Sequence, residues 1–444
     1  MKYRSVALGA LYTVLLTVAP ALIIDKLLSA VLVIPLSLIL LGFFIKTLIK
    51  PTNITSLSRR LVTLYNGIAI LKIHACSFAV NLILLITFSG VWTNAPYVLI
   101  VCGITYLLLS LLLMLCGCIR MVISSVQLGI VQRLLLIMMW WIPIINIFVI
   151  LKACTKAHYE FELENDRAEL DAVRKESEVC STKYPLLLVH GVFFRDLKFL
   201  NYWGRIPKEL IKNGAVIYYG GQHSAGSVAF CAQELKEKIE KIVNETGCQK
   251  VNIIAHSKGG LDSRYAISLL GMNKYVASLT TISTPHHGCG YADYLLGKAP
   301  KALQEHIAEK YNTALRHFGE KDPDFISAVS DLTQKHCEDM NRIAVNCDDV
   351  YYQSVGSRMK NYRSAGFPLN IVYIIARNFS KNDNDGLVDT ESMKWGEKHI
   401  FYEPKTRRGI SHGDTIDLMR ENIKGFDVLE EYVGIVHGLK EMGF

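Results

Sequence analysis

The stretch VNIIAHSKGGLDSRYAISLL, residues 251–270, joins a short apolar run, a turn of small residues around one serine, and an amphipathic segment. This is the pattern of a strand, a tight turn and a helix, in which a nucleophilic serine projects from the turn. Small residues are needed two positions before and after the serine, because the strand and helix backbones nearly touch. Ala255 and Gly259 occupy these positions. The stretch therefore predicts Ser257 as a nucleophile.

Further apolar runs alternate with helical patterns on both sides of this stretch. Strands are expected near Pro185–Val189, Ala215–Tyr219, Val251–Ala255 and Leu279–Ser283, and helices near 204–212, 227–245 and 259–271. Such alternation predicts an α/β unit with a mostly parallel sheet and helices on both faces. Functional residues of these sheets gather at the carboxyl ends of the strands, which is where Ser257 is expected.

A serine hydroxyl needs a base to take its proton and a third group to orient that base. In this arrangement the chain order is Ser, then Asp or Glu, then His. Asp385 follows a predicted strand at Ile371–Ala376 and precedes the turn-forming Gly386, and His412 comes later in ISHGD. We therefore predict Asp385 as the acid and His412 as the base. The alternatives for the acid are Asp383 and Asp389.

Three other histidines lie near these motifs. His286 and His287 precede every acid candidate, so we interpret them as structural residues or residues at the rim of the site. His256 directly precedes the nucleophile, and in this kind of turn its side chain points into the packing of the sheet. None of the three is predicted to be the base.

Acyl transfer also needs N–H donors for the oxyanion that develops on the substrate. The backbone N–H of Lys258, next to the serine, is one candidate. The other is the N–H of Val192, because Gly191 before it permits close approach of the loop after the first strand. Since the backbone acts here, the side chains of both residues are expected to be replaceable. Phe193 and Phe194 are candidates for lining an acyl site.

The first third of the chain has a different composition. Hydrophobic residues make up 51% of the sequence and the mean hydropathy is +0.25, with the apolar excess before about residue 152. About 20 apolar residues cross a bilayer as a helix. Five stretches qualify by this criterion: 6–24, 27–49, 68–90, 97–119 and 134–151. We predict a five-span transmembrane domain at 1–152, a polar helical linker at 153–182, and an α/β domain at 183–444.

Basic residues orient these spans. The net charge is +8, but no basic helix or other nucleic-acid-binding pattern accompanies it, so a membrane surface is the expected partner and nucleic acid is not. Lys and Arg gather in cytoplasmic connections. They cluster at both ends of alternate connections, namely at Lys46, Lys50, Arg59, Arg60, Arg120 and Arg133. With five spans, this arrangement predicts an extracytoplasmic α/β domain.

The motifs LLLVHGVFF, YYGGQ, IIAHSKGGLDSRY, TTISTPHHG, NDGLV and SHGD together resemble the bacterial true lipases of the α/β-hydrolase superfamily, over about residues 184–444. Ala255 departs from the usual glycine but stays small. The resemblance implies the triad Ser257, Asp385 and His412, oxyanion donors at Val192 and Lys258, and a helical lid at about 291–331. Many members hold a calcium ion with one ligand in the position of Asp414. Its partner aspartate is not found upstream of Asp385, so no cofactor or metal is expected.

The resulting hypothesis is a membrane-anchored serine ester hydrolase that cleaves acyl esters of lipids. One alternative is a phospholipase or transacylase on the same fold, because an alcohol can replace water in resolving the acyl-enzyme. Another is a catalytically inactive domain that serves as a membrane sensor or binding module. The intact serine, acid, base and oxyanion loop argue against the inactive form.

Overall fold

The computed structural model describes the chain apart from residues 1, 25–28, 89–94, 140, 193–200, 318, 378–381 and 405. It divides into two compact units, Met1–Val173 and Arg174–Phe444. We call them the helical unit and the sheet unit, and describe each by itself.

The sheet unit is built on six parallel strands in the spatial order β2-β1-β3-β4-β5-β6. The strands are β1 (Leu186–Val189), β2 (Ile217–Tyr219), β3 (Val251–His256), β4 (Val276–Ile282), β5 (Tyr351–Ser357) and β6 (Lys398–Tyr402). The chain enters the sheet at β1, adds β2 on one side as an edge strand, and then adds β3 to β6 in order on the other side. The prediction of an α/β unit with a mostly parallel sheet is confirmed.

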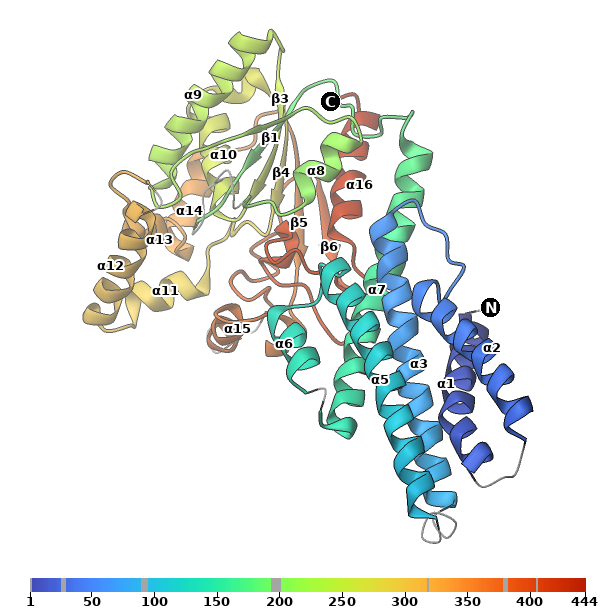
Figure 1. Cartoon of the computed structure of the whole chain (residues 1–444). Coiled ribbons are helices and arrows are strands. Elements are labelled where there is room, and N and C mark those ends of the chain that lie inside the picture. The colour runs from blue at the N-terminus through green and yellow to red at the C-terminus, as the bar shows by residue number, and fades with distance from the viewer. Residues whose placement is uncertain are drawn as a thin grey trace. The chain divides into compact units, whose positions relative to one another are not determined.

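Helices cover both faces of this sheet, as Figure 1 shows. Because side chains alternate along a strand, Leu186 and Leu188 face a core shared with α8 (Ile206–Lys212) and α16 (Val428–Glu441). Their neighbours Leu187 and Val189 pack in the opposite core, with α9 (Val228–Thr246) and α10 (Lys258–Leu269). All four residues of β1 are buried, as expected of a strand covered on both sides.

One predicted strand is wrong. The run Ile371–Ala376 lies within the helix α15 (Leu369–Arg377), in which Tyr373 and Ala376 are buried while Ile371 and Ile374 are exposed. Burial three residues apart is the signature of one helical face, and an unbroken apolar run does not distinguish helix from strand. The strand before the acid is instead β5, which the sequence analysis did not single out.

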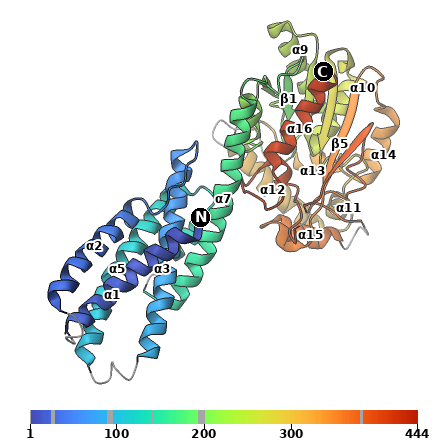
Figure 2. The ribbon, with the colours of Figure 1, turned by 90° about the vertical axis from the view of Figure 1, so that its right-hand side faces the viewer.

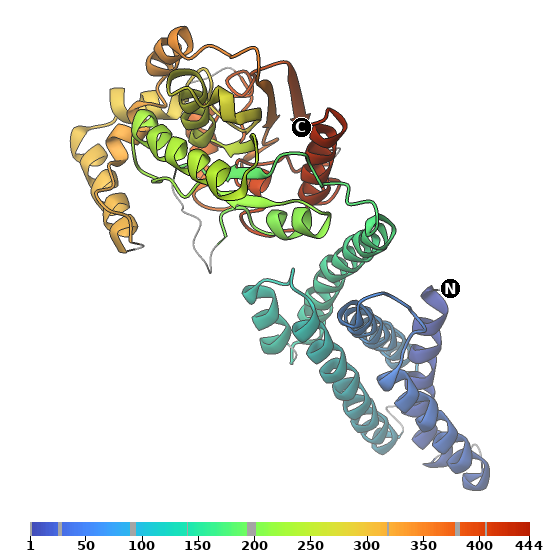
Figure 3. The ribbon, with the colours of Figure 1, turned by 90° about the horizontal axis from the view of Figure 1, so that it is seen from above.

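Helices also fill the segment predicted to be a lid. They are α11 (Gly290–Gly297), α12 (Lys301–His317) and α13 (Phe325–Ser330), and α14 (Gln334–Ile343) follows. They form a small core of their own around Leu295, Ala308 and Phe325. In Figure 3 these helices, coloured yellow to light orange, lie at the margin of the sheet unit. Short 3-10 helices occur at Met272–Tyr275, Tyr362–Ser364 and Asp414–Ile416.

In the helical unit, α1, α2, α3 and α5 run side by side (Figure 2). Their bounds are Lys2–Ile24, Ala30–Ile49, Arg59–Thr87 and Pro96–Ser124. Within the described residues these four helices are long and apolar enough to cross a membrane. Many of their large apolar side chains are exposed, as lipid-facing positions would be.

The fifth stretch predicted to span, 134–151, is not one helix. It is divided between α6 (Ile130–Met138) and the start of α7 (Pro143–Arg174). The nine residues of α6 extend about 13 Å, less than half of the roughly 30 Å hydrocarbon core. The apolar part of α7, residues 143–151, is equally short. The structure therefore has four candidate spans where the sequence predicted five.

Glu160 of α7 connects the two segments that flank this broken stretch. Its fully buried carboxylate accepts hydrogen bonds from Ser125 Oγ (2.5 Å), the backbone N–H of Val126 (2.9 Å) and the backbone N–H of Gln127 (3.2 Å). It also pairs with Arg60 Nη1 at 2.7 Å. Since residues 125–127 directly follow α5 and Arg60 lies in the first turn of α3, α7 has returned at Glu160 to the end of the bundle at which α5 ends.

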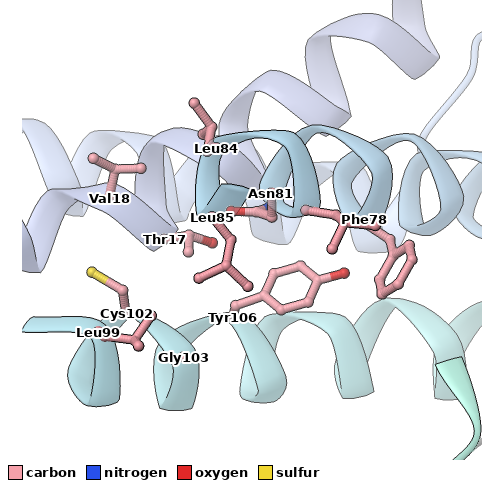
Figure 4. A pocket seen from close by; sticks show the side chains of 11 residues that line it. Thr17, Val18, Phe78, Asn81, Leu84, Leu85, Leu99, Cys102, Gly103 and Tyr106 are labelled. Carbon is pink, nitrogen blue, oxygen red and sulfur yellow. The ribbon is translucent and has the colours of Figure 1, made fainter. Parts of the chain in front are cut away.

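A pocket lies between α1, α3 and α5 (Figure 4). Most of its lining is apolar, and its polar side chains include Thr17 and Asn81. The Thr17 hydroxyl donates to Thr13 O (2.8 Å) and the Asn81 amide donates to Ser77 O (2.8 Å). These two groups are thereby satisfied within their own helices, as polar groups in a bilayer must be.

The Glu160 cluster yields a test of the helical unit. Glu160→Gln places an amide N–H₂ against N–H donors, so at least one buried donor loses its acceptor, at a cost of about 1–3 kcal/mol. We expect a lower midpoint of thermal unfolding for the detergent-solubilised protein. Glu162→Gln is the matched control, because Glu162 is exposed on the same helix, where it pairs with His158 at 3.3 Å. Equal midpoints for the two variants would contradict a structural role for Glu160.

Candidate active site

Ser257 occupies the tight turn between β3 and α10. Its φ of 54° and ψ of −130° are rare for a residue with a side chain, and they aim the hydroxyl away from both elements. The turn is possible because a glycine follows two positions later. A Cβ at Gly259 would lie only 2.4 Å from His190 O of the neighbouring strand end. The small-residue pattern is thus a packing requirement of the turn.

The acid and base predicted from the sequence lie together. His412 Nδ1 is 2.8 Å from Asp385 Oδ2, and the His412 backbone N–H donates to Asp385 O at 2.8 Å. The other carboxylate oxygen of Asp385 accepts from the N–H groups of Leu387 (3.0 Å) and Val388 (2.9 Å). The fully buried Asp385 is therefore fixed by these four hydrogen bonds and by a fifth, from its own N–H to Val388 O at 3.1 Å, and two of the five also fix His412.

The other acid candidates have different surroundings. Asp383 forms an ion pair with Arg358 and its side chain is about half exposed. Asp389 lies across the turn, where it forms an antiparallel bridge with Asn384. Of the three carboxylates, the structure brings Asp385 to His412.

The residues predicted as oxyanion donors belong to the two segments that lie next to Ser257. A Cβ at Gly191 would lie 2.8 Å from Ser257 Cβ, so the loop after β1 passes directly beside the serine and carries Val192 with it. Lys258 is the first residue of α10, and the first N–H groups of a helix have no acceptor within the helix. Phe193 and Phe194, expected to line an acyl site, lie outside the described residues.

The Lys258 side chain departs from the expectation that it is replaceable. It is fully buried, and its Nζ lies 2.7 Å from Asp262 Oδ1 one turn along α10. Burial alone would lower the pKa of Lys258, but the charges of Asp262 and Cys231 and the hydrogen bonds to both side chains together raise it. Removing one partner of a buried ion pair typically costs about 3–5 kcal/mol. The side chain therefore anchors the first turn of α10, although the N–H beside the serine belongs to the backbone.

Of the remaining histidines, His256 and His286 are buried, and His287 is exposed beside Trp395. His286 is buried, where its Nε2 lies 2.9 Å from Thr281 Oγ1 and its ring stacks on Trp395 at 5.1 Å. His256 is buried against Tyr202 and Thr415. The sequence analysis missed these two partners, since a lone hydroxyl far away in the chain carries no local pattern.

The calcium position found in similar lipases does not fit this chain. Both carboxylate oxygens of Asp414 face Arg408 Nη2, at 3.0 and 3.2 Å, and one of them also accepts from the Ser411 N–H at 2.9 Å. A guanidinium thus supplies the positive charge that a cation would supply. No group of three possible metal ligands occurs among the residues that the structure describes.

Comparison with known proteins agrees with this geometry. A family model described as "Putative serine esterase (DUF676)" matches residues 189–316. A triacylglycerol lipase of Vibrio cholerae is 30% identical over 238 residues, which cover 49% of this chain and 75% of that protein. The chain belongs to the triacylglycerol lipase-like α/β-hydrolases. The apolar helices of its first unit lie outside the part that matches the family model.

Two further similarities add context for this lipase-like chain. A triacylglycerol lipase of Pseudarthrobacter phenanthrenivorans is 33% identical over 175 residues, 36% of this chain, and the match spans about half (54%) of that enzyme. The crystal structure of Bacillus licheniformis lipase BlEst2 in mature form is 20% identical, with a TM-score of 0.42. That comparison covers 57% of this chain and 92% of the other.

Replacing the acid tests its assignment in this lipase-like site. Asp385→Asn keeps the size of the side chain but removes the charge that orients His412, so we expect a loss of kcat on the order of 10⁴-fold. Asp383→Asn removes a surface ion pair worth at most about 1 kcal/mol, and should leave kcat nearly unchanged. Steady-state hydrolysis of a soluble ester measures both. Full activity in Asp385→Asn, with loss in Asp383→Asn or Asp389→Asn, would refute the assignment.

Proposed function

We propose that this chain is a membrane-anchored serine ester hydrolase that cleaves acyl esters of lipids through an acyl-enzyme. The observation that carries the proposal is the contact of His412 with the buried carboxylate of Asp385, next to a serine on a strained turn. The ring of His412 lies 4.5 Å from the ring of His256, the residue before Ser257. Base and nucleophile therefore share one end of the sheet.

The first half of the reaction transfers the acyl group to the protein. His412 Nε2 takes the hydroxyl proton while Ser257 Oγ attacks the ester carbonyl. The carbonyl oxygen becomes an oxyanion, which the N–H groups of Val192 and Lys258 stabilise. Asp385 holds the resulting imidazolium in position. When the ester bond breaks, His412 gives the proton to the leaving alcohol, and the acyl group remains on Ser257.

The second half repeats these steps with water. His412 removes a proton from water, the hydroxide adds to the acyl carbonyl, and collapse of the second oxyanion releases the carboxylic acid. The proton then returns from His412 to Ser257 Oγ. An alcohol in place of water would give a new ester. The molecule that takes the acyl group from Ser257, water or an alcohol, therefore distinguishes a hydrolase from a transacylase.

Lipid esters are the substrate class that the surroundings favour. The relatives named above are triacylglycerol lipases. Four helices able to cross a bilayer belong to the same chain, so membrane lipids are always near the sheet unit. Glycerolipids and similar acyl esters are therefore the proposed substrates.

We propose that α11 and α12 form the lid. The lid was predicted at about 291–331, and hydrogen bonds to the rest of the sheet unit fix its later part, after α12. The buried carboxylate of Glu320 accepts from the N–H groups of Ser224 (2.8 Å) and Ala225 (3.0 Å), and Asp331 accepts from the N–H of Val228 (2.6 Å). α11 and α12 pack on α13 through the small apolar core that contains Leu295, Ala308 and Phe325, so in this proposal they open about that core while α13 stays fixed.

Ser257→Ala in the full-length protein tests the reaction. With the nucleophile gone, release of fatty acid from glyceride and p-nitrophenyl esters of graded chain length should fall to background, because the triad acts as a unit. Ser263→Ala is a suitable control, since its hydroxyl only bonds Gly259 O within α10. Chromatography of the products with glycerol present separates free acid from new ester. Undiminished release by Ser257→Ala would exclude the proposed mechanism.

We also propose four membrane crossings with the sheet unit on the cytoplasmic side. Support comes from the hydrogen bonds of Glu160 to residues 125–127, which make α6 and the start of α7 a hairpin that enters and leaves at one end of the bundle. That end carries Arg59, Arg60 and Arg120, as cytoplasmic ends do. With the N-terminus in the cytoplasm, five spans would place the sheet unit outside the cytoplasm. Four spans return the chain to the cytoplasmic side.

Protease accessibility decides between the two topologies. Protease added to spheroplasts that contain the protein should leave the sheet unit whole, and should degrade it after the membrane is permeabilised. An antibody epitope at the C-terminus reports both results. Degradation of the sheet unit in spheroplasts with an intact membrane would contradict four crossings and support the extracytoplasmic placement that five crossings predict.

A further inference from the structure

His256 is a fully buried histidine that the acid–base chemistry does not use. It ends β3 and directly precedes Ser257. Its Nδ1 lies 2.6 Å from the Tyr202 hydroxyl, and its Nε2 lies 3.3 Å from Thr415 Oγ1. Tyr202 precedes α8, and Thr415 lies three residues after the catalytic base. Both ring nitrogens are therefore engaged by residues from other parts of the chain.

The other hydrogen bonds of the Tyr202 and Thr415 hydroxyls determine which nitrogen of the His256 ring carries a proton. The Gly191 N–H donates to the Tyr202 hydroxyl oxygen at 3.0 Å, and the Thr415 hydroxyl donates to the backbone carbonyl of His412 at 2.7 Å. A hydroxyl has one proton to donate. The Thr415 proton is already used, so Thr415 Oγ1 must accept from His256 Nε2–H. A neutral imidazole carries one N–H, so with Nε2 as the donor its Nδ1 accepts from the Tyr202 hydroxyl.

Only one form of the ring satisfies this arrangement. It is the neutral imidazole with its proton on Nε2, in which Nδ1 accepts from the Tyr202 hydroxyl and Nε2 donates to Thr415 Oγ1. Burial, and then the nearby His412, lower the pKa of His256 well below its ordinary value. A neutral ring also avoids a second positive charge 4.5 Å from His412 when that residue takes the serine proton.

The hydrogen bonds form one continuous chain, running from the Gly191 N–H through Tyr202, His256 and Thr415 to the His412 carbonyl. One end holds the loop that carries Val192, and the other holds the loop that carries the base. We propose that His256 is a positioning residue that, as a neutral ring, fixes the oxyanion loop and the base loop relative to Ser257. The inference rests on the proposed ester hydrolysis, and adds a specific role for three residues outside the triad.

Matched variants test this relay. Tyr202→Phe and Thr415→Val each remove one hydroxyl with little change of shape. We expect each to lower kcat about 10- to 100-fold, below the roughly 10²- to 10³-fold effect of deleting an oxyanion donor, with KM changed less than about twofold. Thr415→Ser keeps the hydroxyl and should restore kcat. The double variant Tyr202→Phe/Thr415→Val should be little worse than the worse single variant, because both interrupt one chain.

Tyr432→Phe is the control for simple loss of a buried hydrogen bond. The Tyr432 hydroxyl donates to Thr415 O at 2.9 Å, in the same core but outside the relay. We expect it to lower the thermal midpoint about as much as Thr415→Val while leaving kcat nearly unchanged. An equal loss of kcat in Tyr432→Phe, or a failure of Thr415→Ser to restore kcat, would overturn the proposal.

A second measurement does not depend on activity. In protein labelled with ¹⁵N-histidine, with the His256 signals identified by their loss in His256→Gln, NMR distinguishes the two neutral tautomers and the imidazolium. The relay requires the Nε2–H tautomer at pH 7, and a change in its shifts in Thr415→Val. The Nδ1–H tautomer or an imidazolium would overturn the proposal even in an active enzyme. Absence of ester hydrolysis together with the Nε2–H tautomer would instead contradict the proposed function alone.

Discussion

The close approach of three backbone segments at the carboxyl ends of β1 and β3 is the constraint on which the site depends. The loop after β1 passes beside Ser257 at Gly191, and the start of α10 passes beside the same loop at Gly259. A side chain at either glycine would collide with backbone atoms or with the serine. The strained φ of Ser257 persists because β3 and α10 are held by the packed cores on both faces of the sheet. The geometry of nucleophile and oxyanion loop is thus a consequence of backbone packing.

Buried polar groups then fix what the backbone brings together. Asp385 accepts hydrogen bonds from the turn that carries it and from the base, and Lys258 is tied to Asp262 within α10. In each case a charged or polar side chain is desolvated, and is stable only because every contact is made at once. The helical unit uses the same principle at Glu160, which joins α7 to the loop after α5. Buried polar groups of this kind favour one arrangement of the chain over other compact arrangements, and this effect is larger than their net contribution to stability.

Local patterns predicted most of the framework, whereas contacts between distant residues escaped the sequence analysis. The small residues around Ser257, and the order of serine, acid and base, follow from rules that act within a few residues. The helix α15 was misread because its apolar run fits two periodicities, and only burial at Tyr373 and Ala376 decides between them. The stretch 134–151 has the composition of a span, but Glu160, beyond its end, bonds back to residues 125–127. Tyr202 and Thr415 likewise gain their roles only through partners far away in the chain.

The central claim is that Ser257 is a nucleophile activated by His412. Reaction of the purified full-length protein with a fluorophosphonate, followed by digestion and tandem mass spectrometry, tests it most directly, since only an activated serine is phosphonylated quickly. The account predicts one major adduct, on Ser257, whose formation becomes slow in His412→Ala. No adduct, an adduct on another serine, or an equal rate in His412→Ala would contradict it.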